Sequence, residues 1–104
     1  MEQFSLTEML ANVHYAKPEE LLKQVEAMFL RIAQMSPDQA VAAYQAVDFV
    51  EIGHAEGDPR IEKVRGALIV RMKALVNDPP KGMYGALQLA PMFRSVVGPL
   101  WDDQ

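Results

Sequence analysis

Residues 36–59, SPDQAVAAYQAVDFVEIGHAEGDP, hold a helix start, an apolar helix and a helix stop in one stretch. Ser36 with Gln39 three positions later forms a capping box, and the proline between them suits the first helical position. The residues from about 37 to 52 are apolar nearly all round, which is typical of a central, buried helix. A glycine can end that helix, and the Asp-Pro pair at 58–59 can start the next. The stretch therefore predicts two helices joined by a short turn.

The chain on both sides of this stretch carries further helix signals. Ser5 and Glu8 form another capping box, and Pro18 is followed by two glutamates that suit a helix N-terminus. Apolar residues recur at spacings of three and four, and no stretch alternates with period two. We therefore predict an all-α fold in a single domain, residues 1–104: a compact bundle of four main helices plus one or two short C-terminal helices. The expected helices cover about 5–15, 18–35, 37–52 and 59–76, with short ones at 82–90 and 91–97.

Composition narrows the class of protein. Half of the 104 residues are apolar and 23% are charged, which is ordinary globular usage. The chain has no cysteine, so disulfides and thiolate metal sites are excluded, and this fits the reducing cytosol. The first ten residues, MEQFSLTEML, lack the basic segment of a secretory signal. Residues 83–101 are apolar but contain two prolines, two glycines and Arg94, so a membrane span is not expected. We expect a cytoplasmic protein.

Charge is distributed unevenly along the chain. Residues 1–58 hold ten acids and three bases, whereas residues 59–101 hold seven bases and two acids. The halves can neutralise each other within one fold, or the second half can offer a basic face to a partner.

One of these bases falls in an unexpected place. Arg65 lies inside the apolar arc of the helix predicted at 59–76, where a charge must find a carboxylate or reach past the core. Asp48 and Glu51 share one narrow side of the preceding helix. We predict a structural ion pair between Arg65 and these two acids.

The sequence offers little for catalysis. It contains no GxSxG, phosphate-binding Gly-rich loop, HExxH or CxxC motif, and two of its three serines are explained as helix caps. The best metal candidates lie together in a turn but lack ligand spacing. We therefore expect no enzyme, no cofactor and no metal. The metal candidates considered are Glu51, His54, Glu56 and Asp58.

The segment MYGALQLAPMFRSVVGPLW, residues 83–101, concentrates methionine, aromatic residues and arginine, the types that protein interfaces favour. It can bind a partner or close the protein's own core. If it is core, the contact surface is expected on a small second stripe of the helix at 59–76. This stripe also predicts that two copies of the chain associate as a homodimer. The predicted partner-binding residues are Met92, Phe93, Arg94, Val96, Val97, Leu100 and Trp101, and the predicted self-association residues are Ala67, Val70 and Ala74.

These observations favour a small non-enzymatic regulator that binds and masks a functional surface of another protein. It would act as an anti-activator, inhibitor or adaptor, and a transcription regulator is one suitable target. The alternative is a small helical DNA-binding regulator that uses the basic helix 59–76. Against it, the bases of that helix scatter around its circumference: Arg60, Lys63, Arg65, Arg71 and Lys73. Nucleic acid is therefore the less expected partner.

Overall fold

The computed structural model describes residues 5–12, 17–54, 57–81 and 86–103. These residues form helices and turns with no strand among them, which confirms the all-α prediction. None of the helices within these ranges is long and apolar enough to cross a membrane. In chain order they are α1 (Leu6–Asn12), α2 (Pro18–Met28), the 3-10 helix η1 (Phe29–Gln34), α3 (Pro37–His54), α4 (Pro59–Asn77), α5 (Ala86–Val97) and α6 (Leu100–Asp103).

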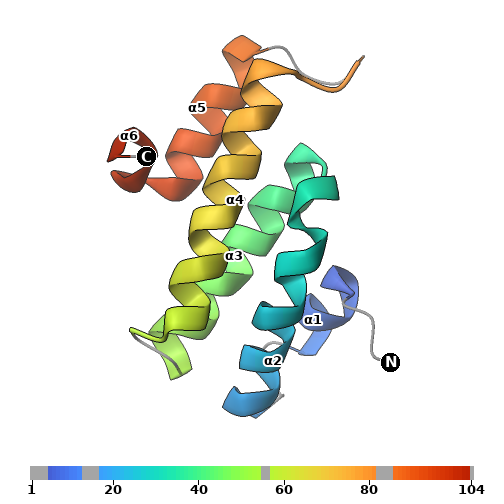
Figure 1. Ribbon diagram of the computed structural model, residues 1–104, viewed down its shortest axis with the longest axis vertical. Helices are drawn as coiled ribbons and strands as arrows, with labels where there is room; N and C mark the ends of the chain where they lie inside the picture. The colour runs from blue at the N-terminus through green and yellow to red at the C-terminus, as the bar shows by residue number, and fades with distance from the viewer. Residues whose placement is uncertain (1–4, 13–16, 55–56, 82–85, 104) are drawn as a thin grey trace.

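Helix α4 is the centre of the bundle. In Figure 1 it runs between α5 on one side and the α2–η1 segment on the other, with α3 behind it, and it packs against all four. Its buried side chains recur at spacings of three and four, as the apolar pattern predicted. They are Ile61, Val64, Leu68, Ile69, Met72 and Leu75, together with Arg65, which the sequence placed inside this arc.

The predicted helix starts are confirmed by their hydrogen bonds. Ser36 Oγ accepts from the Gln39 backbone N–H at 3.2 Å, and Gln39 Oε1 accepts from the Ser36 N–H at 2.9 Å. Asp58 caps α4 by accepting from the Arg60 N–H at 2.8 Å. These caps satisfy backbone donors that have no partner inside the helix, and they fix where α3 and α4 begin.

The second predicted helix is not uniform. We expected one α-helix over 18–35, but the chain tightens into η1 at Phe29. The residue before a proline avoids the helical region, so the helix must end just before Pro37, and a tight 3-10 turn is a common ending. Ile32 stays buried, whereas Phe29 is 39% exposed and Ala33 is exposed as well.

The C-terminal segment also differs from expectation. Two short helices were expected, but α5 is one helix with Pro91 inside it, and residues 82–85 lie outside the described part. Pro91 has no backbone N–H to donate to the carbonyl of Leu87. Because Leu87 is 92% exposed, water can reach this turn of the helix. Gly98 ends α5, and its φ of 76° is a value that glycine adopts easily. Its N–H donates to the Arg94 carbonyl at 2.8 Å.

Candidate protein-binding groove between η1 and α4

The aromatic residues of the C-terminal segment fill the protein's own core. Phe93 is fully buried and Trp101 is 7% exposed, with ring centroids 5.9 Å apart. Val97 is buried as well, and Met92 and Val96 are partly buried against the core. The predicted partner-binding set is therefore corrected: Phe93, Val97 and Trp101 have no surface to offer, because a bundle this small needs them to cover its core.

Two of the predicted contact residues in this segment do lie at the surface. Leu100 is 39% exposed. Arg94 is exposed and forms an ion pair with Asp102 at 3.3 Å. They do not make a binding surface by themselves, since a scattered exposed leucine and an exposed ion pair are ordinary surface features.

The predicted self-association residues, in contrast, lie together on an open surface. Ala67, Val70 and Ala74 form one wall of a groove of about 540 Å³ that runs between α4 and η1. Val70 is 64% exposed, and the groove is mostly apolar. We call it the η1–α4 groove; its lining residues are Phe29, Ile32, Ala33, Ala67, Val70, Arg71 and Ala74.

The 3-10 winding of η1 provides the other wall. With about three residues per turn, side chains three apart lie above one another. Phe29 and Ile32 therefore stand in one column, and Leu30 and Ala33 in the next. Leu30 is 81% exposed and lines a second hollow that adjoins the groove at Phe29, where Lys63 and Val64 of α4 also lie.

Two cations of α4 connect it to η1, Lys63 in the adjoining hollow and Arg71 in the groove itself. The Lys63 Nζ lies 4.3 Å from the centroid of the Phe29 ring, a cation–π contact. The Arg71 Nε donates to the Met35 carbonyl at 3.0 Å, which satisfies an acceptor at the end of η1. These contacts link the two elements.

These cations also give the groove a basic rim. Among the described residues, no carboxylate lies within ion-pair distance of Lys63 or Arg71. Arg60, in the adjoining hollow, is instead paired with Asp58 at 2.9 Å and with Glu19 at 3.3 Å. Glu26 is the only acid among the described residues that line either hollow. The groove is therefore apolar at its floor and positive along α4.

The other side of α4 carries the ion pair predicted from sequence. Arg65 Nη2 lies 2.8 Å from Asp48 Oδ1 and 2.7 Å from Glu51 Oε1, and Nη1 lies 3.0 Å from Glu62 Oε1. Arg65 is buried, and its guanidinium lies 5.9 Å from the Tyr44 ring centroid. The third carboxylate, Glu62, was not predicted, although its position one turn before Arg65 could have indicated it.

This cluster shifts the ionisation of its members. The hydrogen bonds from Arg65 hold the pKa of Glu51 below its usual value. Burial, reinforced by the Asp48 charge, raises the pKa of Tyr44 above its usual value. No buried side-chain polar atom of the described residues lacks a hydrogen-bond partner. The cluster therefore joins α3 to α4.

Helix α4 does not present its bases on one face. Arg65 is buried among carboxylates, and Arg60 is held by Asp58 and Glu19. Lys73 lies with its Nζ 5.2 Å from the Trp101 ring centroid, on the α6 side. A nucleic-acid-binding helix usually shows a continuous basic stripe, which α4 lacks.

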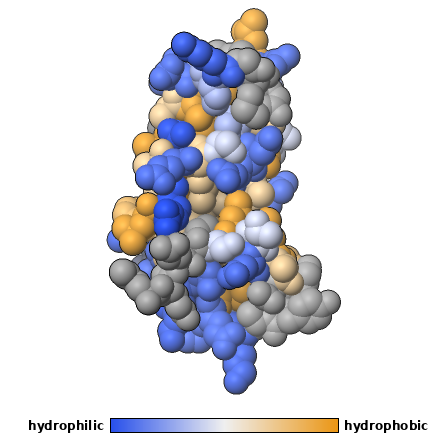
Figure 2. All heavy atoms as spheres, turned by 90° about the vertical axis from the view of Figure 1, so that its right-hand side faces the viewer, coloured by the Kyte–Doolittle hydropathy of each residue, from blue (hydrophilic) through white to orange (hydrophobic). Residues whose placement is uncertain are grey.

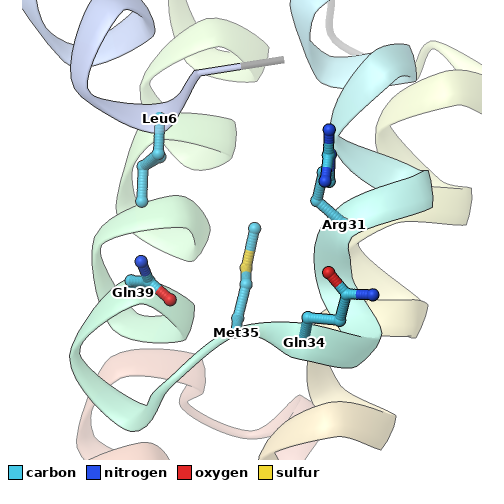
Figure 3. Close-up of a pocket in the computed structure, with 5 residues that line it drawn as sticks. All are labelled: Leu6, Arg31, Gln34, Met35 and Gln39. Atoms are coloured by element: carbon cyan, nitrogen blue, oxygen red, sulfur yellow. The ribbon is translucent and has the colours of Figure 1, made fainter. Parts of the chain in front are cut away.

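A separate, more polar hollow lies between α1, η1 and α3. Figure 3 shows Arg31 and Gln34 of η1 facing Leu6 and Gln39 across it, with Met35 between them. Gln39 is already used in the capping box, and Met35 is buried. The remaining polar side chains do not combine an acid, a base and a nucleophile, so this hollow is the weaker candidate.

The described residues contain no group of three acids or histidines that could hold a metal ion. Of the metal candidates considered from sequence, Glu56 and the side chain of His54 lie outside the described part, and Asp58 serves as a helix cap.

The chain matches no protein-family model, and no curated protein or solved structure is significantly similar to it.

Proposed function

We propose that this protein is a small cytoplasmic, non-enzymatic regulator that binds another protein and masks a functional surface on it. It acts as an anti-activator, inhibitor or adaptor. A transcription regulator is a suitable target, because covering its contact helix would block it without any contact to DNA. The groove is the surface through which we expect binding, in the helix-in-groove mode.

The observation that carries this proposal is the clustering of exposed apolar side chains around one groove. Single exposed hydrophobic residues are normal, but Phe29, Leu30 and Val70 lie around the same two adjoining hollows. Figure 2, which views the right-hand side of Figure 1, shows hydrophobic side chains in small groups set among hydrophilic ones. An apolar centre with a polar rim is the usual composition of a protein interface.

The test is a pull-down with tagged protein from the lysate of the native host, with nuclease added. The tagged variants are wild type, Val70→Asp in the groove and Ile52→Asp as a matched control. Ile52 is 85% exposed on α3 and lines neither hollow of the groove. We expect one stoichiometric protein that wild type and Ile52→Asp retain and Val70→Asp loses.

Three outcomes would count against this proposal. Recovery of the tagged protein alone would mean that no protein partner binds it stably in the lysate. Retention of a partner by Val70→Asp would move the binding surface elsewhere. Binding that depends on nucleic acid and falls steeply with salt would favour the DNA-binding alternative, since phosphate contacts release counterions.

A further inference from the structure

We propose that the η1–α4 groove receives an amphipathic helix of the partner whose apolar face is flanked by carboxylates. This inference rests on the proposed function and adds the chemistry of the segment that binds. It commits to an acidic helical segment of another protein, and not to a second copy of this chain or to a basic or neutral segment.

The dimensions of the groove suit a short helix. Across the adjoining hollow and the groove together, the α4 wall runs from Lys63 to Ala74, which is eleven residue steps or about 16 Å at about 1.5 Å per residue. An occupying helix of about three turns would match this length. Ala67 and Ala74 have small side chains on either side of Val70, so an occupying helix can approach the backbone of α4 closely at these positions. The exposed Leu30 and Phe29 would then contact its apolar face from η1.

The charges around the groove favour acids on that helix. Lys63 lies in the adjoining hollow beside Phe29, and Arg71 lines the groove itself. Neither has a carboxylate partner among the described residues. The protein as a whole carries a net charge of −4, so this positive rim contrasts with an acidic background. A helix with a glutamate or aspartate near each end of its apolar face would place opposite charges together, which gives orientation and specificity.

The same charges disfavour a second copy in the groove. A two-fold antiparallel pairing of α4 with α4 centred near Val70 would place the Arg71 side chains of the two copies next to each other, one residue from the axis. Like charges placed together across an interface oppose association. Self-association through Ala67, Val70 and Ala74, as expected from the sequence, is therefore the competing outcome of the test.

The experiment is a selection from a phage-displayed library of 14-residue helical peptides against the intact protein. Every peptide keeps one fixed apolar face of leucine and alanine, and the flanking positions vary among Glu, Gln and Lys. Selected peptides are synthesised and their affinities measured for wild type, Val70→Asp, Lys63→Glu, Lys63→Arg and Lys17→Glu. Lys17→Glu makes the same charge change at the far end of α2, where Lys17 is exposed. Sedimentation of the unliganded protein gives its oligomeric state.

We expect glutamate to be enriched at the flanks. Val70→Asp should abolish binding of the selected peptides. Reversing one rim charge should weaken it about five-fold, while Lys63→Arg and Lys17→Glu stay within about two-fold of wild type. Added salt should reduce the difference between wild type and Lys63→Glu, because exposed charges are screened.

Several results would overturn the inference. They are enrichment of lysine or glutamine at the flanks, binders indifferent to Val70→Asp, no enrichment at all, and a dimer that Val70→Asp converts to monomers. They are distinguishable from failure of the proposed function. If the lysate partner depends on Val70 but the selected flanks are not acidic, the regulator proposal stands and only the acidic helix is wrong.

Discussion

The two sides of α4 show how neighbouring helices, and not residue type alone, decide what a surface can do. On the side that faces α3 and α5, Arg65 is buried among three carboxylates, and α5 contributes the fully buried Phe93. On the side that faces η1, Val70 is 64% exposed and Lys63 and Arg71 have no acidic partner among the described residues. We call these the closed side and the open side. Helices α3 and α5 cover the first and leave the second accessible.

The largest difference in stability is expected when one phenylalanine on each side is replaced by alanine. Phe93→Ala empties a fully buried site, so it should lower the free energy of unfolding by about 3–5 kcal/mol. Phe29→Ala removes a ring that is 39% exposed, and the loss should be about 1–2 kcal/mol. Urea denaturation of both variants gives the comparison. Equal losses would mean that the open side is as well packed as the closed side.

The next effect concerns the ion pairs. Arg65→Ala leaves Asp48 and Glu51 without their cation, and we expect a loss of about 2–3 kcal/mol, at the lower end for buried pairs because the acids reach water. Arg94→Ala breaks an exposed pair with Asp102 and should change stability by less than about 0.5 kcal/mol. Thermal and urea unfolding at neutral pH measure both. A small loss for Arg65→Ala would show that the closed side does not depend on this cluster.

The sequence predicted the ion pair of the closed side and the Ala67, Val70 and Ala74 stripe of the open side, but not the η1 wall of the groove. Caps, apolar spacing and the misplaced charge located the main helices and the acids that Arg65 meets, because these signals are local or follow from the cost of a buried charge. Phe29 and Leu30 were not predicted as groove residues. The exposure of Phe29 depends on where the chain changes from α to 3-10 winding. The Ser-Pro stop at 36–37 was a signal of that tight ending.

The C-terminal segment shows that composition does not distinguish a core from an interface. Its methionine and aromatic content fits an interface and a core equally well, and only the tertiary arrangement decides between them. Phe93 and Trp101 lie in the core because no other described element covers that side of α4 and α3. Apolar density in a sequence therefore indicates that a surface needs cover, but not which surface stays open.

Acid should affect the closed side through Glu51. Its pKa is lower in the folded state than the usual 4.5, so the unfolded state binds its proton first as pH falls. The stability that Glu51 contributes is thus complete above about pH 4.5 and is lost as pH falls through the folded-state pKa. Glu51→Gln should be less stable at neutral pH and should lose less stability on acidification than wild type.

Urea unfolding from neutral pH to about pH 2.5 tests this, with Glu20→Gln as the control at an exposed position of α2. The same pH dependence for wild type and Glu51→Gln would contradict the assignment.

The smallest expected effect is a gain, at the position on α4 that lies one turn before Val70. Gly66 is in the middle of the helix, and a Cβ added there meets nothing within 4 Å. Gly66→Ala should raise stability by about 0.5–1 kcal/mol, or the melting temperature by about 2–8 °C, since alanine loses less backbone entropy on folding.

Gly57→Ala is the matched comparison, because Gly57 has φ of 82°, where a side chain is strained, and it should be destabilising. Calorimetry on both variants should therefore give shifts of opposite sign. A loss of stability for Gly66→Ala would mean that α4 is packed more closely at this point than the open side implies, and that the groove has less room for a helix.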